Sequence, residues 1–383
     1  MQCLKLPRSL AVFLALCSLV ISAIVSAALR PGDPLPRSVD KPLETLPGVD
    51  TYYDSVEVEP GIRLRSLLTT PSGAIKPINP VLFAQWVSCG SLELNPESTS
   101  TLAMIARESG LALIRVDRAG AGDSQGPSCD KLDYDTEVAH YITAFEQLLQ
   151  DERIDASRVY IYGSSLGSTT APLIAASLQE KGYNIAGIVV QGGGALTHLE
   201  RMINFERFYL ERRPDQVARS DIHQQMNDRI HFQTEYLVKG RHPDEIAKDS
   251  PALAAVRDDT RGLNLDNHYG RPFSWHQQAA KQNFLGAWEK LNAKVLVIFN
   301  EYDQFETLHG HQLIVDTVNR QSPGHAQLLI QEGLGHSSWR YSSMENAYAD
   351  VEGSRETSTT GRAILTWLRA IRVNKKKLNS RPD

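Results

Sequence analysis

The sequence predicts an α/β fold, in which a mostly parallel sheet is flanked by helices and interrupted by one helical cap. Apolar, β-rich runs alternate with helical patterns up to residue 194, and the alternation resumes at residue 294. Such alternation is typical of a parallel sheet covered on both faces. Between these regions it stops, and Arg, His, Gln, Asp and aromatic residues dominate. We therefore expect one sheet domain formed by residues 28–194 and 294–383, with the cap over residues 195–293.

The periodicity of apolar residues gives the expected elements in chain order. Two β-like runs, over residues 51–58 and 62–70, predict an antiparallel start. The alternating region then consists of strand 80–87, helix 98–109, strand 111–117, helix 135–150, strand 158–162, helix 168–181 and strand 185–191. The cap contains helical patches over residues 199–212 and 275–291 and no convincing strand. After the cap come strand 294–300, helix 307–319, strand 326–331 and an amphipathic closing helix over residues 358–372.

The N-terminus has the pattern of a secretory signal peptide. Lys5 and Arg8 precede an apolar run, and small residues follow that run. This order predicts a signal peptide over residues 1–27, cut after Ala27, and hence a secreted or periplasmic protein. The alternative is an uncleaved membrane anchor over residues 10–28, because the apolar run is near the minimum length of a spanning helix.

The composition excludes some classes of function. The chain has 383 residues, of which 42% are hydrophobic and 22% charged, values that are ordinary for a globular protein. Its net charge is −5, and basic residues do not gather in the pattern of a nucleic-acid-binding surface. We expect no nucleic-acid partner.

Two cysteines, Cys89 and Cys129, remain after the predicted cleavage. An exported chain meets an oxidising compartment, in which a single remaining pair tends to join. We therefore expect a Cys89–Cys129 disulfide. On the chain-entropy estimate it would stabilise the fold by about 4 kcal/mol.

The segment from Gly163 to Gly167 has the pattern of a sharp junction between a strand and a helix. A Gly-x-Ser-x-Gly turn in this context holds its serine in a strained conformation, with the hydroxyl exposed above the sheet. The flanking glycines allow the strand and helix backbones to approach each other closely. Ser165 is at the apex of the turn and is the candidate nucleophile, whereas Ser164 lies one residue before the apex.

A serine hydroxyl is a weak nucleophile at neutral pH, so it needs a histidine as base and an acid that orients the histidine. Asp303 and His336 each follow a predicted strand of the second half. Both therefore lie beyond the carboxyl ends of parallel strands, the edge at which such sheets place their sites. We expect Asp303 and His336 to act with Ser165, and Glu301 and Glu306 are the reserve acids.

An oxyanion that develops during attack by the serine needs hydrogen-bond donors. The first expected donor is the backbone N–H of Leu166, which follows the nucleophile. The second is expected in the loop after strand 80–87, where Trp86 and Val87 are the candidates. A disulfide at Cys89 would help to hold this loop.

The remaining histidines and glycines do not predict a bound cofactor. The ten histidines other than His336 have no metal-ligand spacing, and we expect them to be polar residues of the surface or the cap. They are His140, His198, His223, His231, His242, His268, His276, His309, His311 and His325. The loop that begins at Gly120 departs from a dinucleotide fingerprint, because its third glycine, Gly126, comes one residue too late. No metal or cofactor is expected.

Taken together, these residues resemble the α/β-hydrolase superfamily, and more narrowly its exported bacterial serine hydrolases of the serine aminopeptidase and prolyl-oligopeptidase-like esterase type. The likeness lies in QWVSCGS at 85–91, DRAGAGDSQG at 117–126, the turn at Ser165, and the stretch 270–303 with GRPFSW and AWEKLNAKVLVIFNEYD. The order Ser165, Asp303, His336 is the one such proteins use. Trp86 departs from the family pattern, which commonly has Gly after the loop Gln, so the second oxyanion donor and the acyl-pocket width stay open.

The resemblance and the site residues together imply a serine hydrolase that cleaves carboxylic esters through an acyl-enzyme. The first alternative is a serine peptidase or aminopeptidase that acts on short peptides. The second is a non-catalytic binding module with the same fold. The expected partner is a small ester or short peptide, and a membrane is a partner only if the N-terminal segment remains uncleaved.

Overall fold

The computed structural model describes residues 34–38, 40–213, 217–356 and 358–378. The described part of Pro34–Asp383 forms one compact unit. The predicted signal peptide, and the alternative anchor, lie outside the described residues. In the ranges that are described, no helix is both long and apolar enough to cross a membrane.

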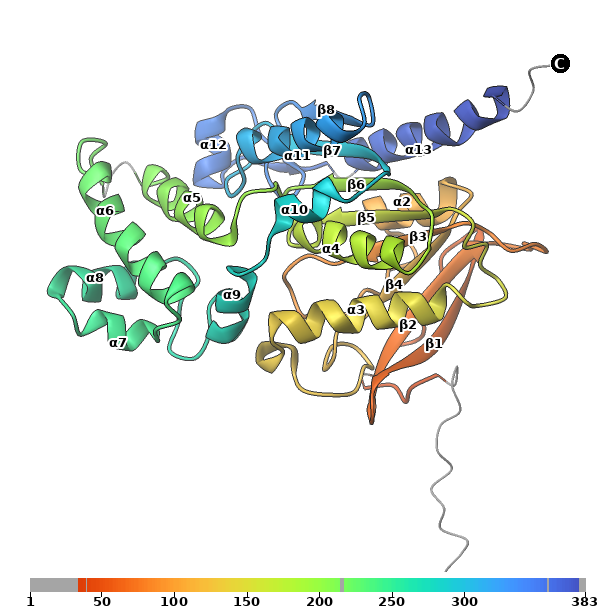
Figure 1. Ribbon diagram of the computed structural model, residues 1–383, viewed down its shortest axis with the longest axis horizontal. Helices are drawn as coiled ribbons and strands as arrows, with labels where there is room; N and C mark the ends of the chain where they lie inside the picture. Colours follow the sequence, from red (N-terminus) through yellow and green to blue (C-terminus); the bar gives the residue numbers. More distant parts are fainter. Residues whose placement is uncertain (1–33, 39, 214–216, 357, 379–383) are drawn as a thin grey trace, which may run out of the picture. The chain divides into compact units, whose positions relative to one another are not determined.

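An eight-stranded sheet forms the centre of this unit, in the order β1-β2-β4-β3-β5-β6-β7-β8 (Figure 1). Strand β2 pairs antiparallel with both β1 and β4, and all other neighbours are parallel. The mostly parallel sheet predicted from the alternation is thus confirmed. The strands are β1 (Val49–Glu59), β2 (Ile62–Pro71), β3 (Pro80–Ala84), β4 (Ala112–Val116), β5 (Val159–Ser164), β6 (Ile185–Gln191), β7 (Lys294–Asn300) and β8 (Ala326–Gln331).

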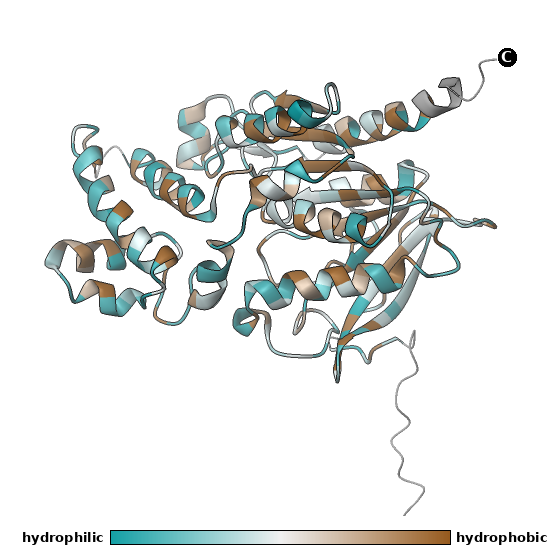
Figure 2. Ribbon diagram, viewed as in Figure 1, coloured by the Kyte–Doolittle hydropathy of each residue, from teal (hydrophilic) through white to brown (hydrophobic). Residues whose placement is uncertain are grey.

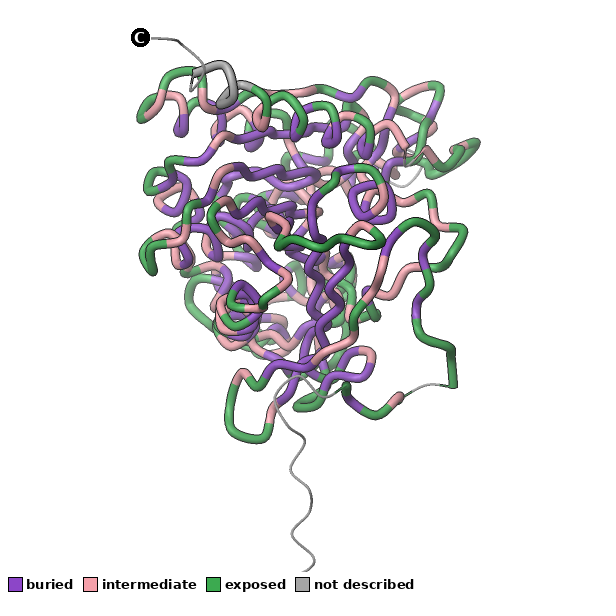
Figure 3. Tube along the Cα trace, turned by 90° about the vertical axis from the view of Figure 1, so that its right-hand side faces the viewer, coloured by how far each residue is buried: buried purple, intermediate pink, exposed green. Residues whose placement is uncertain are grey.

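Helices cover both faces of the sheet. One face packs against α2 (Thr101–Glu108) and α13 (Ser358–Leu378), and the other packs against α3 (Tyr134–Leu148), α4 (Gly167–Glu180) and α11 (Leu308–Gln321). Figure 2 shows hydrophobic residues concentrated on the strands and on the sides of the helices that face them, and Figure 3 shows buried residues gathered in the interior. Successive residues of β3 alternate between the two cores, as the period of a strand requires.

Strand β3 ends three residues earlier than the sequence predicts, at Ala84 instead of residue 87. The carbonyls of Gln85 and Trp86 accept hydrogen bonds from the Arg118 guanidinium, at 3.2 and 2.6 Å. The side chain of Arg118 thus takes the place of a neighbouring strand, and the chain leaves the sheet as a loop.

The chain between β6 and β7 is helical, and the described part of it contains only isolated β-bridges. Figure 1 shows most of these helices grouped to the left of the sheet. The helices are α5 (His198–Glu211), α6 (Ile222–Gln233), the π-helical turn η2 (Thr234–Val238), α7 (Pro243–Ala247), α8 (Pro251–Asp259), α9 (Phe273–Ala279) and α10 (Phe284–Glu289). They have a core of their own, in which Met202, Phe232, Tyr236 and Ile246 are buried together.

The helical patch predicted over residues 275–291 is divided in the structure between two helices, α9 and α10. Asn283 begins α10, and its side chain accepts a hydrogen bond from the backbone N–H of Gly286 at 2.8 Å. Helix α10 packs against α4 and α11, and Trp288 belongs to the core beneath the sheet. The last part of the predicted cap segment therefore packs with the helices of the sheet.

Candidate active site

Ser165 lies in the turn between β5 and α4 and has a left-handed backbone conformation, with φ of 52°. Its backbone N–H donates to the carbonyl of Gln191 on β6 at 2.8 Å, which fixes the turn against the next strand. A Cβ on Gly163 would lie 2.3 Å from the carbonyl oxygen of Gly167, and one on Gly167 would lie 1.9 Å from that of Ala84. Only glycine fits at either position, so the backbone has the close approach that the sequence pattern predicts.

The structure brings Ser165, His336 and Asp303 together in one chain of hydrogen bonds. Ser165 Oγ lies 2.9 Å from His336 Nε2, and His336 Nδ1 lies 2.8 Å from Asp303 Oδ2. Asp303 follows β7, and its Oδ1 accepts the backbone N–H groups of Phe305 and Glu306 at 2.8 and 2.9 Å. Its carboxylate therefore has a fixed orientation toward the histidine.

The charges of this chain of hydrogen bonds follow from its surroundings. Burial alone would raise the pKa of Asp303, but His336 and the two backbone donors outweigh it and hold that pKa below its ordinary value. Burial would likewise lower the pKa of His336, but the Asp303 carboxylate raises it above its ordinary value. An ionised Asp303 accepts the Nδ1 proton, which leaves Nε2 free to accept the proton of Ser165.

The reserve acids do not contact His336. Glu306 forms an ion pair with Arg201 of α5, and Glu301 accepts the backbone N–H of Gly333 at 2.8 Å. Among the three acidic candidates, only Asp303 is hydrogen bonded to the histidine.

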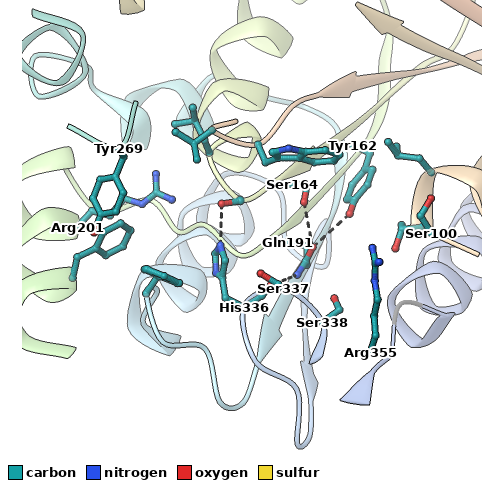
Figure 4. Close-up of a pocket in the computed structure, with 18 of the residues that line it drawn as sticks. Ser100, Tyr162, Ser164, Gln191, Arg201, Tyr269, His336, Ser337, Ser338 and Arg355 are labelled. Atoms are coloured by element: carbon teal, nitrogen blue, oxygen red, sulfur yellow. Dashed lines mark hydrogen bonds between the residues drawn. The ribbon is translucent and has the colours of Figure 1, made fainter. Parts of the chain in front are cut away.

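A cavity of about 630 Å³ opens beside Ser165 and His336. One wall comes from the loop after β3 and from α2, and the opposite wall comes from α5 and α9. Its apolar lining consists of Trp86, Val87, Leu94, Leu102, Leu166, Met202, Phe205, Trp275 and Phe305. Its polar lining includes Ser100, Tyr162, Ser164, Gln191, His198, Arg201, His276, Ser337, Ser338 and Arg355, several of which Figure 4 labels.

The predicted oxyanion donors, Leu166, Trp86 and Val87, all line this cavity. In the described ranges, their backbone N–H groups donate to no protein acceptor. The carbonyls of Trp86 and Val87 point to other partners, because they accept from Arg118 at 2.6 Å and from Arg271 at 3.1 Å. These two arginines thus hold the loop that carries the candidate second donor.

The sequence reasoning missed the group of charges that holds this loop. Glu137 of α3 is buried and receives both arginines, with Arg118 Nε at 2.5 Å and Arg271 Nη1 at 3.2 Å. Trp275 Nε1 also donates to Glu137, at 3.1 Å. Arg118 and Arg271 lie in the DRAGAGDSQG and GRPFSW segments, but nothing in either segment names a partner far away in the chain.

The predicted disulfide is present, and it joins Cys89 of the same loop to Cys129. Arg271 donates to the carbonyl of Cys129 at 3.0 Å. The disulfide and the buried arginines therefore meet at one side of the loop after β3.

The prediction that the remaining histidines are polar residues of the surface or the cap is wrong for His140 and His311, which are buried on α3 and α11. His140, His198, His268, His276 and His311 are all buried. A neutral imidazole costs less to bury than a charged one, and sequence spacing does not distinguish a buried neutral histidine from an exposed one. Two of these histidines, His198 and His276, line the cavity.

Comparisons with known proteins agree with this fold. The sequence model described as "Alpha/beta hydrolase family" matches residues 97–351. No curated protein sequence gives a significant match.

Solved structures share the fold at low sequence identity. Proline iminopeptidase of Mycobacterium smegmatis has a TM-score of 0.51 and 14% identity, over 84% of this chain and 99% of its own. A hypothetical protein of Pseudomonas aeruginosa has a TM-score of 0.51 and 13% identity, over 88% of this chain and 99% of its own. A putative dipeptidyl aminopeptidase IV of Bacteroides ovatus has a TM-score of 0.50 and 10% identity, over 84% of this chain and 36% of its own. The family's sequence model matches more than half of the length of this chain, and the chain therefore belongs to the α/β hydrolase family.

Proposed function

We propose that this protein is a serine hydrolase that cleaves carboxylic esters and forms an acyl-enzyme at Ser165. The observation that carries the proposal is the chain of hydrogen bonds from Ser165 Oγ through His336 to Asp303, at 2.9 and 2.8 Å, on a serine with left-handed backbone conformation. Family membership supports hydrolysis, and the geometry supports serine as the nucleophile.

In this proposal, Ser165 Oγ attacks the ester carbonyl carbon while its proton moves to His336 Nε2. The Asp303 carboxylate stabilises the imidazolium that forms. The tetrahedral oxyanion accepts hydrogen bonds from the Leu166 N–H and from an N–H of Trp86 or Val87. His336 then gives its proton to the leaving alkoxide, and the C–O bond breaks. Water, deprotonated by His336, then attacks the acyl carbon. The bond from this carbon to Ser165 Oγ breaks, His336 returns its proton to Oγ, and the carboxylic acid leaves.

The charge of the cavity favours esters over peptides with a free N-terminus. An aminopeptidase needs an unpaired carboxylate for the substrate ammonium group. Among the described residues that line the cavity, Glu93 is the only acid. Its carboxylate is already bound by Arg37 at 2.9 Å and by the hydroxyl of Tyr53 at 2.6 Å, and Arg37 leads the groups that hold its pKa low against burial. An ester places no such demand on the cavity.

We also propose that residues 195–293 act as a cap and that the protein is exported. Helices α5 and α9 supply one wall of the cavity, as expected of a cap over Ser165. The Cys89–Cys129 disulfide is compatible with the oxidising compartment that a signal peptide over residues 1–27 would reach. Mass spectrometry of the mature N-terminus tests this directly: a chain that begins at Met1 would contradict cleavage after Ala27.

Labelling with a fluorophosphonate probe tests the nucleophile. The wild type should react, and Ser165→Ala should not, whereas Ser164→Ala should react as the wild type does. A folded wild type that stays unlabelled would favour the non-catalytic module. A panel of p-nitrophenyl esters and aminoacyl-naphthylamides then separates the substrate classes, and turnover of amides without turnover of esters would exclude the esterase.

A further inference from the structure

Three buried histidines form a hydrogen-bonded chain whose direction is fixed at one end. His276 Nε2 lies 2.8 Å from the carbonyl oxygen of His268. A carbonyl only accepts, so His276 carries its proton on Nε2 and has a lone pair on Nδ1. His198 Nε2 lies 3.1 Å from that Nδ1 and must donate to it. A neutral His198 therefore has its own lone pair on Nδ1.

Both rings are uncharged at neutral pH. Burial lowers the pKa of His198 to about 3, with a further contribution from the Arg201 cation. Burial also lowers the pKa of His276 well below its ordinary value, and the two neighbouring histidines act in the same direction. The third histidine carries its proton on the same nitrogen, since His268 Nε2 lies 3.1 Å from the carbonyl oxygen of Arg261 and donates to it. The tautomer of His198 is thus set by the fold.

His198, whose lone pair is on Nδ1, is one of the residues that line the cavity beside Ser165. It is 4% exposed. Within the described part of the chain, its Nδ1 has no protein partner, yet it is not fully enclosed. It is an unused hydrogen-bond acceptor on an otherwise buried side chain.

A donor lies next to this acceptor. Arg201 is three residues further along α5, on the same face of the helix, and it also lines the cavity. Its Nε is paired with Glu306, while neither Nη has a partner or is fully enclosed in the described structure. In Figure 4 the Arg201 guanidinium points toward the side of the cavity on which His336 lies.

We propose that the α5 wall binds a hydroxyl group of the substrate, which donates to His198 Nδ1 and accepts from an Arg201 Nη. A hydroxyl is the small group that does both through one oxygen. A carboxylate has no proton for His198, and an ammonium group cannot accept from Arg201 and is repelled by it. The inference rests on the proposed hydrolysis at Ser165, and it assigns hydroxylated esters as the preferred substrate class.

The test compares esters that differ only in this group. Hexanoate p-nitrophenyl ester is compared with its α-hydroxy and β-hydroxy derivatives, and ethyl hexanoate with hydroxyethyl hexanoate, so that a hydroxyl on either side of the ester is sampled. The matching methyl ethers can accept from Arg201 but cannot donate to His198. We expect at least one hydroxylated ester to exceed its methyl ether in kcat/KM by about tenfold, the effect of one hydrogen bond to a confined polar group.

Variants of His198 identify the acceptor. His198→Leu should abolish the preference for the hydroxyl, and His198→Asn should restore part of it, because the amide oxygen can stand near the position of Nδ1. His231→Leu, at a histidine whose side chain is 58% exposed, is the matched control and should keep the preference. NMR of the imidazole nitrogens gives a readout without turnover, and His198 should carry its proton on Nε2 throughout the neutral pH range.

The outcomes separate this inference from the proposed function. If the wild type hydrolyses none of these esters and resists the fluorophosphonate, the proposed function fails. If it hydrolyses the esters but treats each hydroxylated ester like its methyl ether, the hydroxyl site alone is wrong. The proposed hydroxyl site would also be wrong if His198→Leu kept the preference for hydroxylated esters, or if NMR found the proton of His198 on Nδ1.

Discussion

Replacing Glu137 by glutamine tests whether a buried charge holds the loop after β3, from which we propose that the second oxyanion donor comes. Glu137 is 2% exposed and is the shared partner of Arg118, also 2% exposed, and Arg271, 0% exposed. Through these arginines it anchors the carbonyls of Trp86 and Val87. Glutamine keeps the size and one acceptor oxygen of the side chain but removes the charge.

The expected loss of stability follows from the burial of all three charges. Removing one partner of a buried ion pair costs about 3–5 kcal/mol, because the remaining charge is left uncompensated. Glutamine has nearly the volume of glutamate, so no cavity adds to this cost. We expect the free energy of unfolding of Glu137→Gln to fall by about 3–5 kcal/mol at neutral pH. We also expect kcat for esters to fall by up to about 100-fold, the cost of one lost oxyanion donor.

The difference in stability should depend on pH. Burial would raise the pKa of Glu137, but Arg118 and Arg271 outweigh it and lower that pKa below its unfolded value. A carboxyl with a lowered pKa stabilises the fold above its unfolded pKa, and this stabilisation is lost as the pH falls through the folded pKa. The two proteins should therefore converge in stability on acidification below the ordinary carboxyl range.

Urea unfolding followed by circular dichroism measures the first effect, and initial rates with an ester measure the second. Leu178→Ala is the control: Leu178 is fully buried near the carboxyl end of α4, about 18 Å along that helix from Leu166. It should lose about 2–5 kcal/mol and keep its kcat. The reasoning would be refuted if Glu137→Gln lost stability but kept the kcat of the wild type, since the buried charge would then not hold the loop.

Three further predictions concern the hydrogen-bonded residues and the disulfide. The apparent pKa of the acid limb of the pH profile of kcat/KM should lie above the usual histidine value of 6.5, because Asp303 outweighs burial and raises the pKa of His336. In Asp303→Asn this apparent pKa should be lower, and kcat should fall by about 10⁴-fold. Ser165→Gly should be inactive, but its free energy of unfolding should rise by about 1 kcal/mol, because glycine removes the strain of a left-handed φ of 52°. An unchanged midpoint of urea unfolding would argue against that strain. The double substitution of Cys89 and Cys129 by serine should cost about 4 kcal/mol for a loop with a sequence separation of 40, measured by urea unfolding, and equal stability with and without the disulfide would contradict the chain-entropy account.

The sequence predicted well those parts of the fold that depend on local pattern. Strands β6 and β7 have the bounds that their apolar runs indicate, because a strand buried on both faces must be apolar throughout. The bounds of the edge strand β8 also agree with its apolar run. The pattern of Gly163 and Gly167 predicted the turn at Ser165, because backbone atoms close to both positions leave no room for a Cβ. The order of Ser165, Asp303 and His336 along strand ends then placed them at one edge of the sheet.

Parts of the site that depend on long-range partners could not be predicted in this way. Glu137 is a polar residue on an otherwise amphipathic helix, and in the sequence it resembles any exposed acid. Its role requires Arg118 from the loop after β4 and Arg271 from beyond α8. The burial of His198 could not be predicted for the same reason, because its partner His276 lies about eighty residues away.

The contacts of the cap segment bear on how substrates are selected. Arg271, in the second half of the segment, forms an ion pair with Glu137 and donates to the carbonyl of Val87 in the loop after β3. Arg201 of α5 forms an ion pair with Glu306 in the loop that carries Asp303. Both ion pairs are buried, and separating either would leave an uncompensated charge in the protein interior. An opening of the whole segment would therefore disturb both the loop after β3 and the loop that carries Asp303. It follows that α5 acts as a fixed wall, so substrate preference should respond to the side chains on its cavity face rather than to opening of the cap.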